Sequence, residues 1–138
     1  MGVTIFSKNY SVDIGYGGFA RLRRTVAEQC PEEIRKHYLQ LPDTSFSKPE
    51  QQKKYDDKTE ELYKKYNDKY GKVINFLYAP VTEKTLGYDA AEQILGIIDG
   101  YEDYSVYCFM GENRLVMFSD FVRILRDSVS TKSGFGWY

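Results

Sequence analysis

The sequence predicts an α+β fold, with a small antiparallel or mixed sheet formed from strands near both termini and several helices packed against it. Runs rich in β-branched and aromatic residues occupy positions 3–7 and 10–14, and similar runs return at 104–110 and 114–118, around a hairpin turn expected at 111–113. The residues between these runs have helical periodicity. Because strands and helices do not alternate along the chain, a parallel βαβ sheet is not expected.

Length and charge limit the class of protein. The chain has 138 residues, of which 42% are hydrophobic and 28% charged, the balance of one globular domain spanning residues 1–138. Lys and Arg number 19 and Asp and Glu number 20, so the formal net charge is −1. Proteins that bind nucleic acid through its phosphates usually carry a basic excess, so nucleic acid is not an expected partner.

The sequence also predicts where the protein works. It starts without a basic region followed by a long apolar stretch, and no apolar run approaches the length of a membrane span. We therefore expect neither secretion nor a membrane partner. Cys30 and Cys108 lack CxxC spacing and indicate buried thiols in a reducing compartment, which favours a cytoplasmic location.

A glycine-rich turn and two helices are expected after the second strand. The glycines within residues 15–18 predict a tight turn or a close approach between backbones. From Phe19 to Cys30 apolar residues recur at helical spacing. Pro31 should end or kink this helix and begin a second, short one that runs to about Leu41.

The most polar part of the chain is a long, charged helix expected at about 49–70. Ser47 as cap, Pro49 in the first turn and Glu50 three residues after the cap form a start signal, and Gly71 is expected to close the helix in the left-handed conformation. One face carries Tyr55, Leu62, Tyr63, Tyr66 and Tyr70. This face is either the seam by which a solvated helix rests on the domain or a partner-binding edge.

The remaining elements lie in the second half of the chain. Residues 73–78 are interpreted as a helix, and Asp89 is expected to cap another at 90–98. Ser119 is expected to cap the last helix. The tail at 134–138 is too aromatic to stay in solvent, so it should dock as a closing strand or fill a groove.

One motif suggests a phosphate site. Residues 15–20 match the G-x-G-x-x-A dinucleotide fingerprint, but Pro31 and another helix stand where that fold needs a second parallel strand. A weaker interpretation remains, because amides at a helix N-terminus attract anions and Arg21 and Arg24 lie one turn further on. Alternatively, the glycines only form a turn and the arginines face water.

Catalytic signatures are missing from the sequence. His37 is the only histidine, which excludes a multi-histidine metal site and leaves one candidate general base on a helix, at an expected surface or semi-buried position. The chain has no GxSxG, HExxH or Walker loop. The acidic residues near turns match no calcium loop; they are Asp99, Glu102, Asp103 and Asp120. We expect no catalytic residues, no metal and no cofactor.

Tyrosine is unusually abundant. The 13 tyrosines accompany 8 phenylalanines and one tryptophan. They either build an aromatic core or form a contact surface, since tyrosine, tryptophan and arginine are enriched at interface hot spots. The residues expected to contact a partner are Tyr16, Gly17, Gly18, Arg21, Arg24, Tyr55, Tyr63, Tyr66, Trp137 and Tyr138.

Two stretches resemble small uncharacterised proteins encoded by phages and prophages. Residues 10–23 carry an aromatic–glycine–Phe turn followed by an arginine-bearing helix, and residues 76–98 are followed by an aromatic strand and a short last helix. The resemblance carries no known activity. It implies a non-catalytic binding protein from a phage or mobile element that inhibits a host anti-phage defence factor by stoichiometric protein–protein binding, in the cytoplasm of a bacterial host cell.

A second hypothesis belongs to another class of function. The turn from Gly15 to Arg24 offers arginines for phosphate and aromatic rings for a base, so the chain is alternatively a small-molecule binder that sequesters a phosphorylated nucleotide signal. Homo-oligomerisation is compatible with both hypotheses.

Overall fold

The computed structural model describes residues 2–40, 48–109 and 115–138. Its elements, in chain order, are β1 (Thr4–Phe6), β2 (Ser11–Asp13), α1 (Gly15–Glu28), α2 (Glu32–Leu39), α3 (Pro49–Lys65), α4 (Asn67–Tyr78), β3 (Lys84–Leu86), α5 (Tyr88–Ile97), β4 (Val106–Phe109), β5 (Leu115–Met117), α6 (Phe118–Thr131) and β6 (Phe135–Trp137). The predicted α+β class is confirmed. The hairpin turn expected at 111–113 and the loop containing Ser47 lie outside the described residues.

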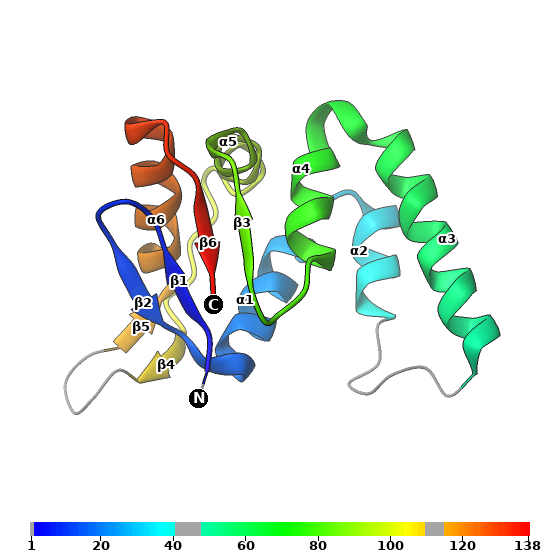
Figure 1. Cartoon of the computed structure of the whole chain (residues 1–138), viewed down its shortest axis with the longest axis horizontal. Coiled ribbons are helices and arrows are strands. Elements are labelled where there is room, and N and C mark those ends of the chain that lie inside the picture. Colours follow the sequence, from blue (N-terminus) through cyan, green and yellow to red (C-terminus); the bar gives the residue numbers. More distant parts are fainter. Residues whose placement is uncertain (1, 41–47, 110–114) are drawn as a thin grey trace.

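The main sheet joins the two ends of the chain. Its strand order is β2-β1-β6-β3 and every pair is antiparallel. The tail docks as a strand between β1 and β3, as one of the two sequence interpretations expected, and Figure 1 shows the N- and C-terminal strands side by side. β4 and β5 pair in a separate two-stranded sheet. The sequence did not predict β3.

Helices α1, α5 and α6 cover one face of the main sheet, while α2, α3 and α4 extend to one side with α3 outermost (Figure 1). The core between sheet and helices is aromatic. The Phe76 ring lies 5.6 Å from that of Phe121 and 5.7 Å from that of Trp137, centroid to centroid. All three side chains are fully buried. Much of the aromatic content therefore builds the core.

The start of α1 differs from the prediction. The helix begins at Gly15, which has a φ of +75°, and not at Phe19, so the other glycines lie in its first turn. The expected close approach occurs at Gly18, where an added Cβ would lie 2.7 Å from the carbonyl oxygen of Tyr107. Gly18 thus lets α1 pack directly against β4.

The predicted helix at 49–70 is two helices. Pro49 occupies the first turn as expected and the N-cap position is Lys48, while Ser47, the expected cap, lies outside the described residues. α3 ends at Lys65, because the backbone leaves the helical region at Tyr66, and α4 begins one residue later. Gly71 lies inside α4 rather than closing a helix. The break turns a polar helix into an apolar one, since α3 buries two of its residues and α4 buries five.

Two caps also differ. Gly87, not Asp89, caps α5, and the Asp89 carboxylate accepts a hydrogen bond from the next backbone amide, that of Ala90. α6 begins before Ser119, with Met117 as its cap. The Asp120 carboxylate accepts a hydrogen bond from the Met117 amide at 2.8 Å, so the acidic residue stabilises this end.

Candidate functional site

A cleft with a volume of about 920 Å³ lies between β3 on one side and helices α3 and α4 on the other. This size falls within the usual range of ligand pockets. α3 contributes Tyr55, Asp56, Thr59, Glu60 and Tyr63 to its lining; α4 contributes Lys72, Ile74, Asn75, Leu77 and Tyr78; residues 79–81 and 84–87 complete most of the rest. Figure 1 shows β3 beside α4, with α3 beyond it.

A buried arginine fixes the end of α4 at this cleft. The Arg23 guanidinium donates hydrogen bonds to the carbonyls of Leu77 (3.0 Å) and Ala79 (2.8 Å), and a longer one to Pro80 (3.4 Å). The last carbonyls of a helix have no partner within it, and a cation is favourable there. The guanidinium also lies 4.5 Å from the Phe19 ring centroid. Burial lowers the pKa of Arg23 to about 10, so the side chain remains charged at neutral pH.

The position of Arg23 in the helical pattern of α1 indicates that this residue faces the core. The residue lies four positions after Phe19 and three before Val26, which are both buried in the core. An arginine at an inward-facing helical position needs buried hydrogen-bond acceptors. The sequence analysis named Arg21 and Arg24 and missed the arginine between them that contacts the cleft.

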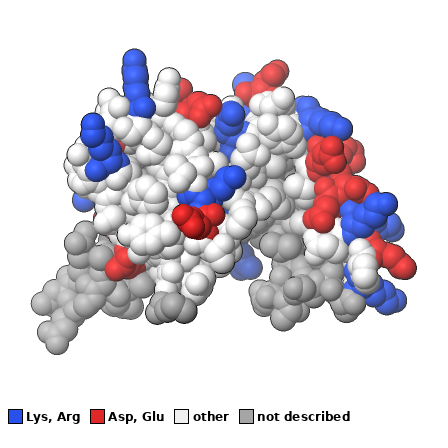
Figure 2. All heavy atoms as spheres, in the orientation of Figure 1, with Lys and Arg blue, Asp and Glu red and all other residues white. Residues whose placement is uncertain are grey.

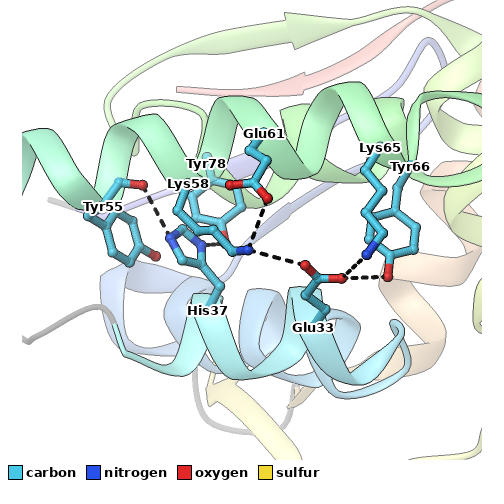
Figure 3. A network of polar contacts seen from close by, with 8 residues as sticks. All are labelled: Glu33, His37, Tyr55, Lys58, Glu61, Lys65, Tyr66 and Tyr78. Atoms are coloured by element: carbon cyan, nitrogen blue, oxygen red, sulfur yellow. Dashed lines mark hydrogen bonds and ion pairs between the residues drawn. The ribbon is translucent and has the colours of Figure 1, made fainter.

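His37 lies behind the cleft and is buried, not at the surface or semi-buried as expected. Its Nε2 is 3.2 Å from the Tyr55 carbonyl oxygen and its Nδ1 is 2.8 Å from the Tyr78 hydroxyl (Figure 3). Because a carbonyl only accepts, Nε2 carries the hydrogen and Nδ1 accepts from Tyr78. Burial is the largest cause that lowers the pKa of His37. The imidazole is therefore neutral and uses both nitrogens to hold Tyr55 and Tyr78 in place.

A second polar group attaches α3 to α2. The Glu33 carboxylate accepts hydrogen bonds from Lys65 (2.7 Å), Tyr66 (2.9 Å) and Lys58 (3.2 Å), as Figure 3 shows. These bonds, with that from Lys65 the strongest, lower the pKa of Glu33 to about 2. Lys58 also pairs with Glu61. These polar contacts with α2 therefore fix α3, which forms one wall of the cleft.

The Cys30 thiol and the His37 imidazole serve separate structural contacts. The Cys30 thiol, just beyond the end of α1, donates to the Val26 carbonyl of that helix, and burial raises the pKa of Cys30 to about 12. His37, the candidate general base, contacts two tyrosines. In the described part of the chain, no group of three histidine, cysteine or acidic side chains could hold a metal ion.

The glycine–arginine segment lies apart from the cleft. Arg21 donates a hydrogen bond to the Val106 carbonyl at 2.8 Å, and its guanidinium lies 4.9 Å from the Tyr107 ring centroid. Tyr16 and Arg24 are exposed on α1. Gly17 has open space around its Cα, unlike the tightly packed Gly18. Arg21 is therefore engaged with β4.

The tyrosines and the tryptophan predicted as contact residues lie in different parts of the structure. Tyr55 and Tyr63 line the cleft, although Tyr55 is buried. Tyr66 faces α2 through its bond to Glu33. Trp137 is wrong as a contact residue because it is fully buried in the core, whereas Tyr138 is exposed on the sheet.

A smaller hollow of about 660 Å³ lies along α6. Arg123 and Arg126 line it, and the Arg123 guanidinium lies 5.6 Å from the Tyr10 ring centroid. The three acidic residues of its lining are Glu102, Asp103 and Asp127. Three carboxylates beside two guanidinium groups give this hollow no excess positive charge for an anion.

No family model, curated protein or solved structure matches the chain. Within the described ranges, no helix is long and apolar enough to cross a membrane.

Proposed function

We propose that the chain is a non-catalytic binding protein whose cleft between β3, α3 and α4 receives part of a partner protein. The observation that carries this proposal is that polar contacts within the protein fix the walls of the cleft. Arg23 fixes the end of α4, His37 fixes Tyr55 and Tyr78, and Glu33 fixes α3. Because these polar groups form hydrogen bonds within the protein, contacts with a partner are made by the other side chains that line the cleft.

The lining has the properties of a contact surface. Tyr63 and Leu86 are half-buried and Val81 is 40% exposed, so each offers apolar area to an incoming side chain. Walls that are fixed before binding lose little conformational entropy when a partner arrives. Apolar and aromatic anchors in such a pocket supply most of the affinity of typical interfaces.

The more specific proposal concerns the partner. The resemblance of residues 10–23 and 76–98 to phage and prophage proteins supports a host anti-phage defence factor as the target, blocked by stoichiometric binding in the bacterial cytoplasm. The near-neutral net charge of −1 fits a protein partner better than nucleic acid.

Site-specific photo-crosslinking tests the binding role. A benzoylphenylalanine replaces Tyr63 in the cleft in one variant and the exposed Tyr104, outside the cleft, in a matched control. After irradiation in host lysate, we expect mass spectrometry to identify the same protein repeatedly with the position-63 variant and not with the position-104 control. Absence of a specific partner at position 63 would contradict the proposal.

The nucleotide-binding alternative has weaker support. The Arg21 guanidinium already hydrogen-bonds Val106 and packs on Tyr107, so a phosphate would have to displace these contacts. A thermal-shift measurement against a panel of nucleotides separates the two functions. Stabilisation that disappears in an Arg21→Ala/Arg24→Ala double variant would favour the alternative.

A further inference from the structure

The direction of the hydrogen bonds in the main sheet can be followed from strand to strand. Thr4 donates to the Tyr138 carbonyl at 2.8 Å and Tyr138 donates to the Thr4 carbonyl at 3.0 Å. Bonded and non-bonded pairs alternate along an antiparallel ladder. Gly136, two residues before Tyr138, therefore also directs its backbone groups to β1, and its neighbours Phe135 and Trp137 direct theirs to β3.

The same alternation determines which backbone groups of β3 point away from the sheet. Lys84 pairs with Trp137 and Leu86 pairs with Phe135, so both direct their amide and carbonyl groups inward. Thr85 lies between them, and its N–H and C=O point away from the sheet. The Gly87 carbonyl beyond the strand accepts from the Ala90 amide. Within β3 itself (Lys84–Leu86), the edge thus presents one donor and one acceptor, both from Thr85.

This edge faces the cleft, because Lys84, Thr85 and Leu86 all belong to its lining. The other edge of the sheet is β2, where Ser11 and Asp13 direct their groups outward by the same rule. Neither residue lines the cleft. Of the two edges, β3 combines outward backbone groups with a hollow beside them.

We propose that the segment bound in the cleft is an extended peptide that adds to the main sheet as a fifth strand along β3. This inference rests on the binding function proposed above. A new strand would lie about 4.8 Å from β3 and exchange two hydrogen bonds with Thr85. Two bonds alone bind weakly, so side chains that enter the cleft supply the remaining affinity.

The lining defines the chemistry of the segment. Tyr63, Val81 and Leu86 favour an apolar side chain at one position. Three acidic residues of the lining, Asp56, Glu60 and Asp89, are balanced by Arg23, Lys72 and Lys84, and Glu60 already pairs with Lys64. The charges of the lining therefore favour neither an acidic nor a basic side chain. Figure 2 shows acidic and basic side chains gathered over α3, whereas the face over β1, β6 and β3 is largely uncharged.

The position of α3 argues for a flexible segment over a second copy of the chain. α3 and α4 both line the cleft beside β3, so an incoming strand must fit between β3 and these helices. A single extended segment is narrow enough to enter, but the edge of another folded sheet brings its own helices with it. The occupant we infer is an extended partner segment without Pro at the paired position, with an apolar residue that enters the cleft.

Peptide selection tests this inference. Random dodecapeptides displayed on phage are selected against the full chain, and enriched sequences are synthesised for affinity measurement. Thr85→Pro removes the outward N–H, which an edge strand tolerates, whereas Thr85→Val keeps it. We expect about tenfold weaker binding to Thr85→Pro, equivalent to one lost hydrogen bond, and unchanged binding to Thr85→Val. Ser11→Pro on β2 is the matched control and should also bind normally.

A second measurement needs no protein variant. Peptides N-methylated at successive positions are titrated into the wild-type chain. Methylation should abolish binding only where the peptide amide faces Thr85, and be tolerated at the adjacent amides. The proposal is overturned if no peptide is enriched, if Thr85→Pro binds equally well, or if N-methylation has no positional effect. If a partner still crosslinks to position 63 in those cases, the proposed binding function stands and only the strand pairing is refuted.

Discussion

Arg23 and Trp137 donate hydrogen bonds to the same carbonyl oxygen, that of Pro80. The Trp137 indole N–H makes the shorter bond, at 2.9 Å, and the guanidinium lies 5.2 Å from the centroid of the tryptophan ring. Residues from α1, from β6 and from the segment after α4 thus meet at one point. That segment leads into β3, so the contact positions the edge strand of the cleft.

Replacing Arg23 with methionine should lower the free energy of unfolding by about 2–3 kcal/mol, because buried carbonyls lose a charged donor. Arg23→Lys should recover part of this loss, since an ammonium donates but cannot span several carbonyls as a guanidinium does. Urea denaturation measures both. Arg24→Met is the matched control at an exposed position and should change stability by less than about 0.5 kcal/mol. Equal stability of the Arg23→Met and Arg24→Met variants would contradict this account.

Acid should destabilise the protein in two separate pH ranges. The pKa of His37 lies below its usual 6.5, so the unfolded chain binds a proton that the folded chain does not as the pH falls below about 6.5. Stability should therefore fall with pH there, by at most about 1.4 kcal/mol per pH unit. The pKa of Glu33, lowered from 4.5 to about 2, adds a further loss only below about pH 4.5.

Urea denaturation between pH 7.5 and 5 measures the first range. A His37→Gln variant should be less stable at pH 7.5 but should lose less stability on acidification, since glutamine does not titrate. If wild type and His37→Gln have the same slope, His37 is not held neutral in the folded state.

The elements that could be predicted from sequence are those with a local signal. β1, β2 and α1 follow from alternation and helical periodicity within a few residues. β3 has no such signal, because its three residues become a strand through pairing with β6, about fifty residues away. The cleft depends on this strand, so the site could not be assembled from local patterns.

The break between α3 and α4 illustrates a second limit. Gly71 is the residue expected to end the helix, yet the break occurs at Tyr66, a residue type with no strong tendency to end helices. The Tyr66 hydroxyl bonds Glu33 on α2, while α4 turns into the core. Tertiary contacts override local propensity here, and they also separate Tyr63, in the cleft, from Tyr66 outside it.

Cys30 should be chemically inert in the folded protein. Burial raises the pKa of its thiol from 9.0 to about 12, which reduces the thiolate fraction at pH 8 by about a thousandfold. In a Cys108→Ser variant, which leaves one thiol, we expect reaction with Ellman's reagent at pH 8 to be slow and to become rapid in denaturing urea. Fast labelling of the folded variant would instead indicate an accessible thiolate and contradict the burial of Cys30.

Two adjacent glycines should respond oppositely to the same substitution. Gly17→Ala should stabilise the protein by about 0.5 kcal/mol, because no other group lies within 4 Å of the added Cβ and alanine is the better helix former. Gly18→Ala should destabilise it by about 1–3 kcal/mol, since its Cβ would lie 2.7 Å from the Tyr107 carbonyl oxygen and 2.8 Å from Ile14 Cγ1. Thermal and urea denaturation of both variants measure the difference. If Gly18→Ala were as stable as Gly17→Ala, α1 and β4 would not be in direct backbone contact.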